Sequence, residues 1–182
     1  MEVLEAIKSR RSVRSYVPAD LSSQQLQTLL EAATWAPSAG NLQPWEFVIV
    51  DNKDVMKQLA RASLNQMWMV EASTIVAVCA DLERTGMIYG ERGKRLYAIQ
   101  DCAAATQNLL LAACSMGLGT CWVGAFFENE VRGILKLPSH VRPLALITIG
   151  KPGEQPTAPP RKRLHEIVHY NAFGNPWVGS EK

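Results

Sequence analysis

The stretch from Arg92 to Met116 constrains the fold more than any other part of this 182-residue chain. It carries the longest helical pattern, and residues 103–113 have little polar surface on any side. A helix that is apolar nearly all round is buried, either in a large core or between subunits. Because a chain of this size forms one domain with a limited interior, the pattern favours a dimer whose interface uses this helix.

The rest of the chain alternates between helical and extended patterns. Helices are expected at residues 1–8, 22–35, 55–64 and 128–137, and strands at 46–50, 74–79 and 144–150, with a strand or a turn at 120–126. The stretch at 74–79 is almost entirely apolar, so this strand should be covered on both faces. The Pro-rich residues after 151 are expected to form an extended arm rather than a separate domain.

Charge and cysteine usage argue against several classes of partner. The net charge is only +2, well short of the basic excess typical of a dedicated nucleic-acid binder. The apolar stretches are interrupted before they reach a membrane-spanning length. Four cysteines lie in apolar contexts without a C-x-x-C pair, which indicates buried thiols in a reducing compartment. Since the first residues also lack the features of a signal peptide, we expect a cytoplasmic protein.

Two basic clusters stand near opposite ends of the chain. The first contains Arg10, Arg11, Ser12 and Arg14, and the second runs from Arg161 to Arg163. Guanidinium groups bind phosphate through paired, charge-assisted hydrogen bonds, and a serine hydroxyl adds another. The clusters therefore predict a phosphate-bearing cofactor, provided that the fold brings them together. The alternative is that both are solvated surface charges.

Two further segments have the chemistry of a ligand site. Between Pro37 and Trp45 the chain carries Ser38, Asn41 and Gln43, whose side chains suit a polyol or the edge of a heterocycle. The alternative is an ordinary proline-bounded turn. The segment from Trp122 through Val123 to Gly124 has no titratable group, and Gly124 would allow close backbone approach to a ligand. A buried strand end would explain these residues equally well.

His165, Glu166 and His169 match H-E-x-x-H, in which two histidines on one helical face bind zinc and the glutamate acts as general base. A catalytic zinc usually needs a third protein ligand. The stretch after His169 has no histidine and one acid, and His140 is the remaining histidine of the chain. We therefore expect a chance match and no metal, with a zinc hydrolase as a remote alternative. The Rossmann, P-loop and G-x-S-x-G signatures are all missing from the sequence.

Four motifs, taken in order, resemble the FMN-dependent nitroreductase family. They lie at residues 10–14, 36–45, 117–126 and 161–164, so the resemblance spans nearly the whole chain. It implies an α+β fold with a central, mainly antiparallel sheet flanked by helices, assembled as an intertwined homodimer. It also implies one FMN-binding domain over residues 1–173, followed by a C-terminal tail over 174–182.

The resemblance also implies an activity and a set of cofactor-binding residues. Family members bind FMN non-covalently and pass a hydride from NADH or NADPH through flavin N5 to a nitroaromatic, a quinone or a similar acceptor in a ping-pong cycle. No catalytic side chain is required, because the cofactor carries the chemistry. By position, the FMN phosphate and ribityl end would meet six residues: Arg10, Arg11, Ser12, Arg14, Arg161 and Arg163.

The remaining positions of the family site surround the flavin ring. Gly124 would present its N–H to N5, next to Trp122 and Val123, and Asn65 would bond the pyrimidine edge. Pro37, Ser38, Ala39 and Asn41 would come from the other subunit, together with Gln43. Trp68 stands where some members carry a lysine, and residues 81–93 would shape the acceptor site. A flavin-binding protein with little turnover, a store or a sensor, is the main alternative function.

Overall fold

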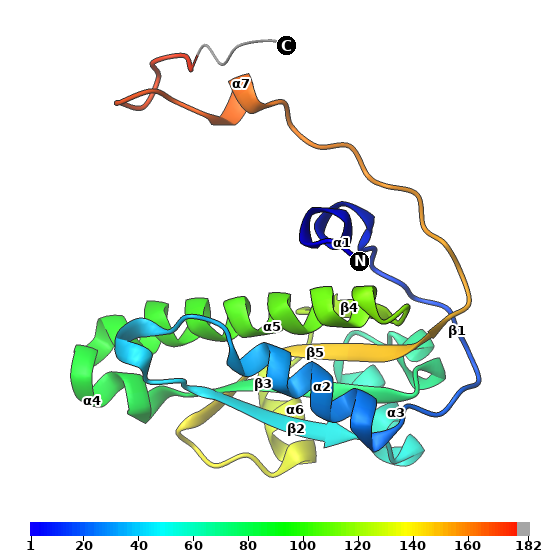
Figure 1. Ribbon diagram of the computed structural model, residues 1–182. Coiled ribbons are helices and arrows are strands. Elements are labelled where there is room, and N and C mark those ends of the chain that lie inside the picture. The colour runs from blue at the N-terminus through cyan, green and yellow to red at the C-terminus, as the bar shows by residue number, and fades with distance from the viewer. Residues whose placement is uncertain (178–182) are drawn as a thin grey trace.

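A twisted antiparallel sheet lies at the centre of the molecule, with helices on both of its faces (Figure 1). The computed structural model describes residues 1–177. Within this range the sheet has five strands: β1 (Tyr16–Val17), β2 (Trp45–Val50), β3 (Thr74–Asp81), β4 (Gly119–Val123) and β5 (Val141–Pro152). The order is β1-β5-β3-β2, and β4 also pairs with β5. All of these pairings are antiparallel, which confirms the expected α+β class.

Strand β3 shows why both faces of the sheet are covered. Its side chains alternate between two cores because successive residues of a strand point to opposite faces. Ile75 and Ala77 pack with α3 (Lys53–Ala62) and α6 (Glu128–Leu135), whereas Val76 and Val78 pack with α2 (Ser23–Thr34) and α5 (Ala98–Ser115). The prediction of a strand covered on both faces is confirmed.

Most helices begin and end near their predicted limits, and α2 shows the local reason. The Ser22 hydroxyl accepts a hydrogen bond from the Gln25 N–H, and the Gln25 side chain accepts one from the Ser22 N–H. This capping box satisfies two backbone donors that the first turn leaves free. The first helix of the chain, α1 (Val3–Ser9), lies on the outer side of α5 (Figure 1).

Helix α5 lies across the sheet and is buried on the side that faces it. Ala105, Leu109 and Ala113 are fully buried, whereas Gln107 on the opposite side is exposed. The helix is preceded by a π-helical turn over Gly93–Tyr97 and by α4 (Leu82–Arg92). Helix α4 was not predicted, because its two glycines interrupt the helical pattern.

The segment after β5 leaves the body of the molecule, as the Pro-rich sequence predicts. Residues 153–163 form neither helix nor strand, and a short helix α7 (Leu164–Ile167) follows beyond α1 (Figure 1). The arm exposes the large apolar side chains of Leu164, Ile167 and Phe173. The predicted tail over 174–182 falls mostly on residues 178–182, outside the described range. Within residues 1–177, we find no helix that combines the length and the hydrophobicity of a membrane span.

Candidate functional site

The arginine segment, residues 10–14, connects α1 to β1 and runs beside the start of β4. The Val13 N–H donates to the Thr120 carbonyl at 2.9 Å, and Ser12 pairs with Thr120 in an isolated parallel bridge. The Ser9 hydroxyl lies 3.5 Å from the Cys114 sulfur, which connects α1 to the C-terminal end of α5. These contacts hold the segment against the sheet.

The guanidinium groups of this segment differ in what they contact. The Arg11 Nη1 donates to the Lys8 carbonyl at 2.7 Å and to the Arg10 carbonyl at 2.9 Å, so this side chain binds the end of α1. The Arg14 guanidinium lies over the Trp68 ring, 5.9 Å from its centroid. Within residues 1–177, neither Arg10 nor Arg14 forms a side-chain ion pair. Their charges therefore remain available to an anion.

A carboxylate also reaches the arginine segment. Glu154, just after β5, accepts a hydrogen bond from the backbone N–H of Arg14 at 2.6 Å. Glu154, Arg10 and Arg11 line a cavity of about 340 Å³ together with residues of β4 and the preceding turn. The backbone donor of Arg14 is therefore satisfied, whereas its guanidinium is not neutralised by this contact.

The cysteines are placed largely as the sequence predicts. Cys79, Cys102 and Cys121 are buried, but Cys114 on α5 is only half-buried. Burial raises the pKa of the Cys121 thiol. The positive charges of Arg14 and Arg10 and a hydrogen bond from Ser12 oppose this rise. The thiol beneath the arginine segment is therefore neutral and acts as a packing group.

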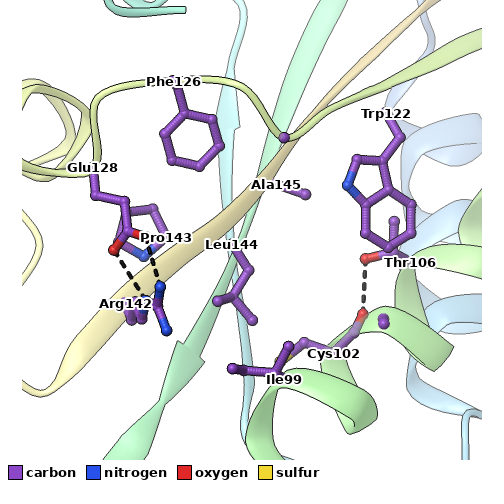
Figure 2. Close-up of a pocket in the computed structure, with 12 residues that line it drawn as sticks. Ile99, Cys102, Thr106, Trp122, Phe126, Glu128, Arg142, Pro143, Leu144 and Ala145 are labelled. Atoms are coloured by element: carbon purple, nitrogen blue, oxygen red, sulfur yellow. Dashed lines mark hydrogen bonds and ion pairs between the residues drawn. The ribbon is translucent and has the colours of Figure 1, made fainter. Parts of the chain in front are cut away.

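Gly124 follows the last residue of β4 and lies at the rim of a second cavity of about 290 Å³. Figure 2 shows the Trp122 and Phe126 rings on opposite sides of this cavity, with Leu144 and Ile99 between them. Among residues 1–177, a Cβ on Gly124 would meet only the Trp122 Nε1, at 3.8 Å, so the backbone here is open to close approach. The Val123 side chain packs into the core instead.

An ion pair closes one side of this cavity. The Arg142 Nη2 and Nε donate to the two carboxylate oxygens of Glu128 at 2.7 and 2.9 Å (Figure 2). The hydrogen bond from Arg142 lowers the pKa of Glu128. Because each group satisfies the other in a bidentate geometry, the pair stabilises the start of β5 against the start of α6.

Asn65 stands in a tight turn after α3, where Leu64 and Asn65 have φ values of 56° and 59°. Asn65 is exposed, and the neighbouring Phe127 N–H donates to the Ala62 carbonyl at 2.9 Å. This bond connects the turn to the loop after β4. Trp68, which follows the turn, contacts Arg14. The structure thus brings Asn65, Trp68, Arg14 and the β4 region to the same side of the molecule.

The predicted loop between Pro37 and Trp45 lies away from the arginine segment, beside the first turn of α5. Its central part, the 38–43 loop, contains a 3₁₀ turn over Ala39–Asn41. The Ser38 hydroxyl accepts a hydrogen bond from the Gln43 N–H at 3.1 Å. The Ala39 N–H points to both carboxylate oxygens of Asp101, at 3.2 Å, and Asp101 lies in the first turn of α5.

The loop and the arginine segment meet opposite ends of α5. Asp101 contacts the loop, whereas Cys114 contacts Ser9 beside the arginine segment. These two α5 residues are separated by about 20 Å, because an α-helix rises 1.5 Å per residue. Within one chain, the contacts that anchor the loop and the arginine segment therefore lie far apart.

The second basic cluster lies on the arm. Arg161 donates weakly to the carbonyls of Pro159 and Pro160, at 3.5 and 3.4 Å, and the Arg163 N–H donates to Glu166. Both arginines are exposed, and in the described part of the chain neither contacts the arginine segment. Within one chain, the two clusters do not converge as the sequence interpretation requires.

The H-E-x-x-H motif does not form the helical face on which its zinc chemistry depends. Helix α7 ends at Ile167, and Val168 has extended dihedral angles, φ −110° and ψ 126°. His169 pairs with Pro176 in a β-bridge, and its ring packs on Phe173 at a centroid distance of 4.4 Å. Among residues 1–177, no group of three or more His, Cys, Asp or Glu side chains is placed to bind a metal.

The sequence patterns did not point to three residues that lie beside the candidate site: Arg84, Asp101 and Glu154. Asp101 had a recognisable signal, since it is a single acid at the start of an apolar helix. Arg84 and Glu154 stand among other charged residues, and only their contacts across the fold reveal them.

Comparisons with known proteins agree with this arrangement. Residues 7–83 and 64–151 match the profile of the nitroreductase family. A candidate NADH dehydrogenase/NAD(P)H nitroreductase of Methanothermobacter thermautotrophicus is 36% identical over 162 residues, covering 86% of this chain and 80% of that protein. The FMN reductase (NADPH) of Bacillus subtilis is 27% identical over 183 residues, covering 93% and 74%. The structure of NADPH:FMN oxidoreductase from Vibrio harveyi complexed with NAD+ superimposes with a TM-score of 0.87 and 29% identity, covering 94% and 77%.

Proposed function

The chain belongs to the nitroreductase family, and we propose that it is an FMN-dependent oxidoreductase that uses NADH or NADPH to reduce a nitroaromatic, a quinone or a similar acceptor. The arginine segment carries this proposal. It presents guanidinium groups without carboxylate partners in residues 1–177, beside the strand that leads to Gly124. The similarity to proteins named FMN reductase and NADPH:FMN oxidoreductase supports the same cofactor.

The phosphate of FMN would be held by the basic residues. In the part of the chain that the structure describes, the guanidinium groups of Arg10 and Arg14 form no ion pair, and Ser12 adds a hydroxyl that can donate. Within one chain, Arg161 and Arg163 on the arm do not reach these residues, so in this proposal they would join them only in the assembled dimer. Arg11 fits this role less well, because its Nη1 already donates to two carbonyls at the end of α1.

When bound, FMN supplies the hydride transfer between the nicotinamide and the acceptor. The chain's own residues bind and orient the ring. Gly124 has no side chain to block the approach of the ring to its backbone, and Trp122 borders the same cavity. Asn65 presents an exposed amide from its tight turn. Where some family members carry a lysine, Trp68 holds the Arg14 guanidinium over its ring, so Arg14 is the cation beside this part of the site.

We propose that the active form is a homodimer in which each FMN contacts both subunits. The position of the 38–43 loop and the arginine segment at opposite ends of α5 supports a site completed by a second copy. The loop and the residue before it would bring to the flavin of the other copy Pro37, Ser38, Ala39, Asn41 and Gln43. Exposed apolar side chains on α1 (Leu4, Ile7) and on the arm support the same arrangement, because monomers rarely expose such surfaces.

In this proposal residues 1–173, arm included, act as one FMN-binding domain. The cytoplasm is the proposed compartment, supported by four cysteines that are free rather than paired.

Spectroscopy tests the function directly. The purified protein should be yellow, contain one FMN per chain, and bleach rapidly when NADH or NADPH is added without oxygen. A yellow protein that bleaches only very slowly would instead be a flavin store or sensor. A colourless protein that takes up no FMN would contradict the proposal.

Analytical ultracentrifugation tests the assembly. The FMN-loaded protein should sediment at twice the 20.1 kDa mass of the chain. A monomer at micromolar concentration that still binds FMN would contradict the shared site.

A further inference from the structure

The 38–43 loop contains one residue, Gln43, whose backbone conformation its side chain does not favour. Gly40, Asn41 and Gln43 have φ values of 58°, 56° and 49°. Glycine adopts this left-handed region freely and asparagine tolerates it, but a glutamine rarely does so without support. Within the loop, the hydrogen bonds are local: the 3₁₀ turn has two backbone bonds, and the Ser38 hydroxyl and the Gln43 side chain add others. Contacts from outside the loop add support at its two ends.

Asp101 holds the start of the loop. Its carboxylate is buried, with 7% of the residue exposed, and both oxygens lie 3.2 Å from the Ala39 nitrogen. Burial of a carboxylate is unfavourable unless it is hydrogen-bonded, and α5 supplies mainly apolar neighbours here. The hydrogen bond that the carboxylate accepts from the backbone N–H of Ala39 explains why an acid stands at this position.

Arg84 holds the end of the loop from the neighbouring helix α4. Its Nη1 donates to the Gln43 carbonyl at 2.6 Å, and its Nη2 donates to Glu46 at 2.6 Å. A second carboxylate, Asp81, lies 3.4 Å from Nη2. Two acids therefore orient the guanidinium, which in turn donates to the loop backbone at the residue with the least favourable conformation.

We propose that Asp101 and Arg84 are positioning residues that hold the two ends of the 38–43 loop in the shape with which it meets FMN. The inference rests on the proposed function, because the loop is taken to contact the flavin. A loop that is already ordered loses less conformational entropy when the cofactor binds, so both residues strengthen binding without touching FMN.

Two variants test the proposal in the full-length protein. Asp101→Leu and Arg84→Met should each weaken FMN binding about tenfold to a hundredfold, the effect of losing one charge-assisted hydrogen bond. FMN dissociation should be faster by a similar factor, measured by flavin fluorescence. Asp101→Asn keeps one acceptor oxygen and Arg84→Lys keeps one donor, so both should be intermediate. This rescue also covers the case in which Asp101→Leu does not fold.

Arg95→Met is the matched control. Arg95 forms an ion pair with Glu91 at 3.0 Å on the neighbouring helical segment and has no hydrogen bond to the loop in the described structure. Its FMN affinity should equal that of the wild type. If Asp101→Leu and Arg84→Met lower the melting temperature but leave the FMN dissociation constant unchanged, the two residues are merely structural and the proposal is wrong.

Hydrogen exchange of the flavin-free protein gives a readout that does not depend on the cofactor. The Ala39 amide should exchange faster in Asp101→Asn and Asp101→Leu than in the wild type, in that order, because its acceptor is weakened and then lost. Unchanged exchange would overturn the positioning role. A wild type that binds no FMN would instead contradict the proposed function, while the exchange of Ala39 still reports on the loop.

Discussion

Replacing Gly40 with alanine should both destabilise the protein and disturb the 38–43 loop. Gly40 has a φ of 58°, in the left-handed region where a Cβ is unfavourable. A Cβ built on it would lie 2.7 Å from the Tyr89 hydroxyl oxygen, well inside van der Waals contact. The substitution therefore adds backbone strain and a collision with α4.

The expected cost follows from these two terms. The left-handed conformation costs an alanine about 1–2 kcal/mol. Tyr89 is 38% exposed and can move, but its ring packs edge-on against Tyr97 at a centroid distance of 5.2 Å. Losing such an aromatic pair costs about 0.5–1.5 kcal/mol. Alanine also restricts the unfolded chain, which offsets roughly 0.4–1 kcal/mol. We expect Gly40→Ala to lower the free energy of unfolding by about 1–3 kcal/mol.

Urea denaturation of the single and double variants separates the two terms. In a Tyr89→Phe background the hydroxyl is gone, so Gly40→Ala should cost less than in the wild type but still about 1 kcal/mol from the backbone alone. Gly133→Ala is the control, because Gly133 is helical and a Cβ there meets no atom of the described residues within 4 Å. It should stabilise the protein by about 0.5–1 kcal/mol.

FMN titration of the same variants measures the effect on the site. Gly40→Ala should weaken FMN binding, whereas Gly133→Ala should leave it unchanged. If Gly40→Ala is as stable as the wild type and binds FMN equally well, the left-handed conformation of the loop and its contact with Tyr89 are wrong.

Four further predictions concern separate parts of the chain. Arg14→Ala should weaken FMN binding roughly tenfold to a hundredfold, because the phosphate loses one charge-assisted hydrogen bond. Unchanged affinity in a fluorescence titration would contradict the phosphate assignment. Because its arginine partner lowers the pKa of Glu128, this carboxylate stabilises the fold at neutral pH and the contribution is lost as pH falls below about 4.5. Glu128→Gln should therefore reduce stability at pH 7 by less than about 1 kcal/mol, the pair being partly exposed, and flatten this part of the acid denaturation curve. Burial raises the pKa values of Cys79 and Cys102 to about 12, so both should resist iodoacetamide at pH 8 until the protein unfolds, and rapid labelling would disprove their burial. His165→Ala should keep the NAD(P)H-dependent reduction of quinones, and one tightly bound zinc per wild-type chain, with activity lost to a chelator, would favour a hydrolase instead.

Local patterns in the sequence were enough to predict most elements of the fold. The capping residues at Ser22 and the apolar run at 74–79 depend on neighbours within a few positions, and the structure places α2 and β3 accordingly. Helix α4 escaped prediction because Gly86 and Gly90 weaken its helical pattern, and Gly90 indeed interrupts it with a φ of 56° and a ψ of −143°.

The motifs that identify the family were also visible in the sequence, because the chemistry of phosphate binding selects particular side chains. The arrangement of those motifs was not. Asp101 and Ala39 are 62 positions apart and Arg84 and Gln43 are 41 apart, so only the packing of α4 and α5 against the loop brings them together. The same packing sets the loop and the arginine segment at opposite ends of α5. Side-chain chemistry is a property of single residues, whereas contacts between distant residues arise only when the sheet and its helices assemble.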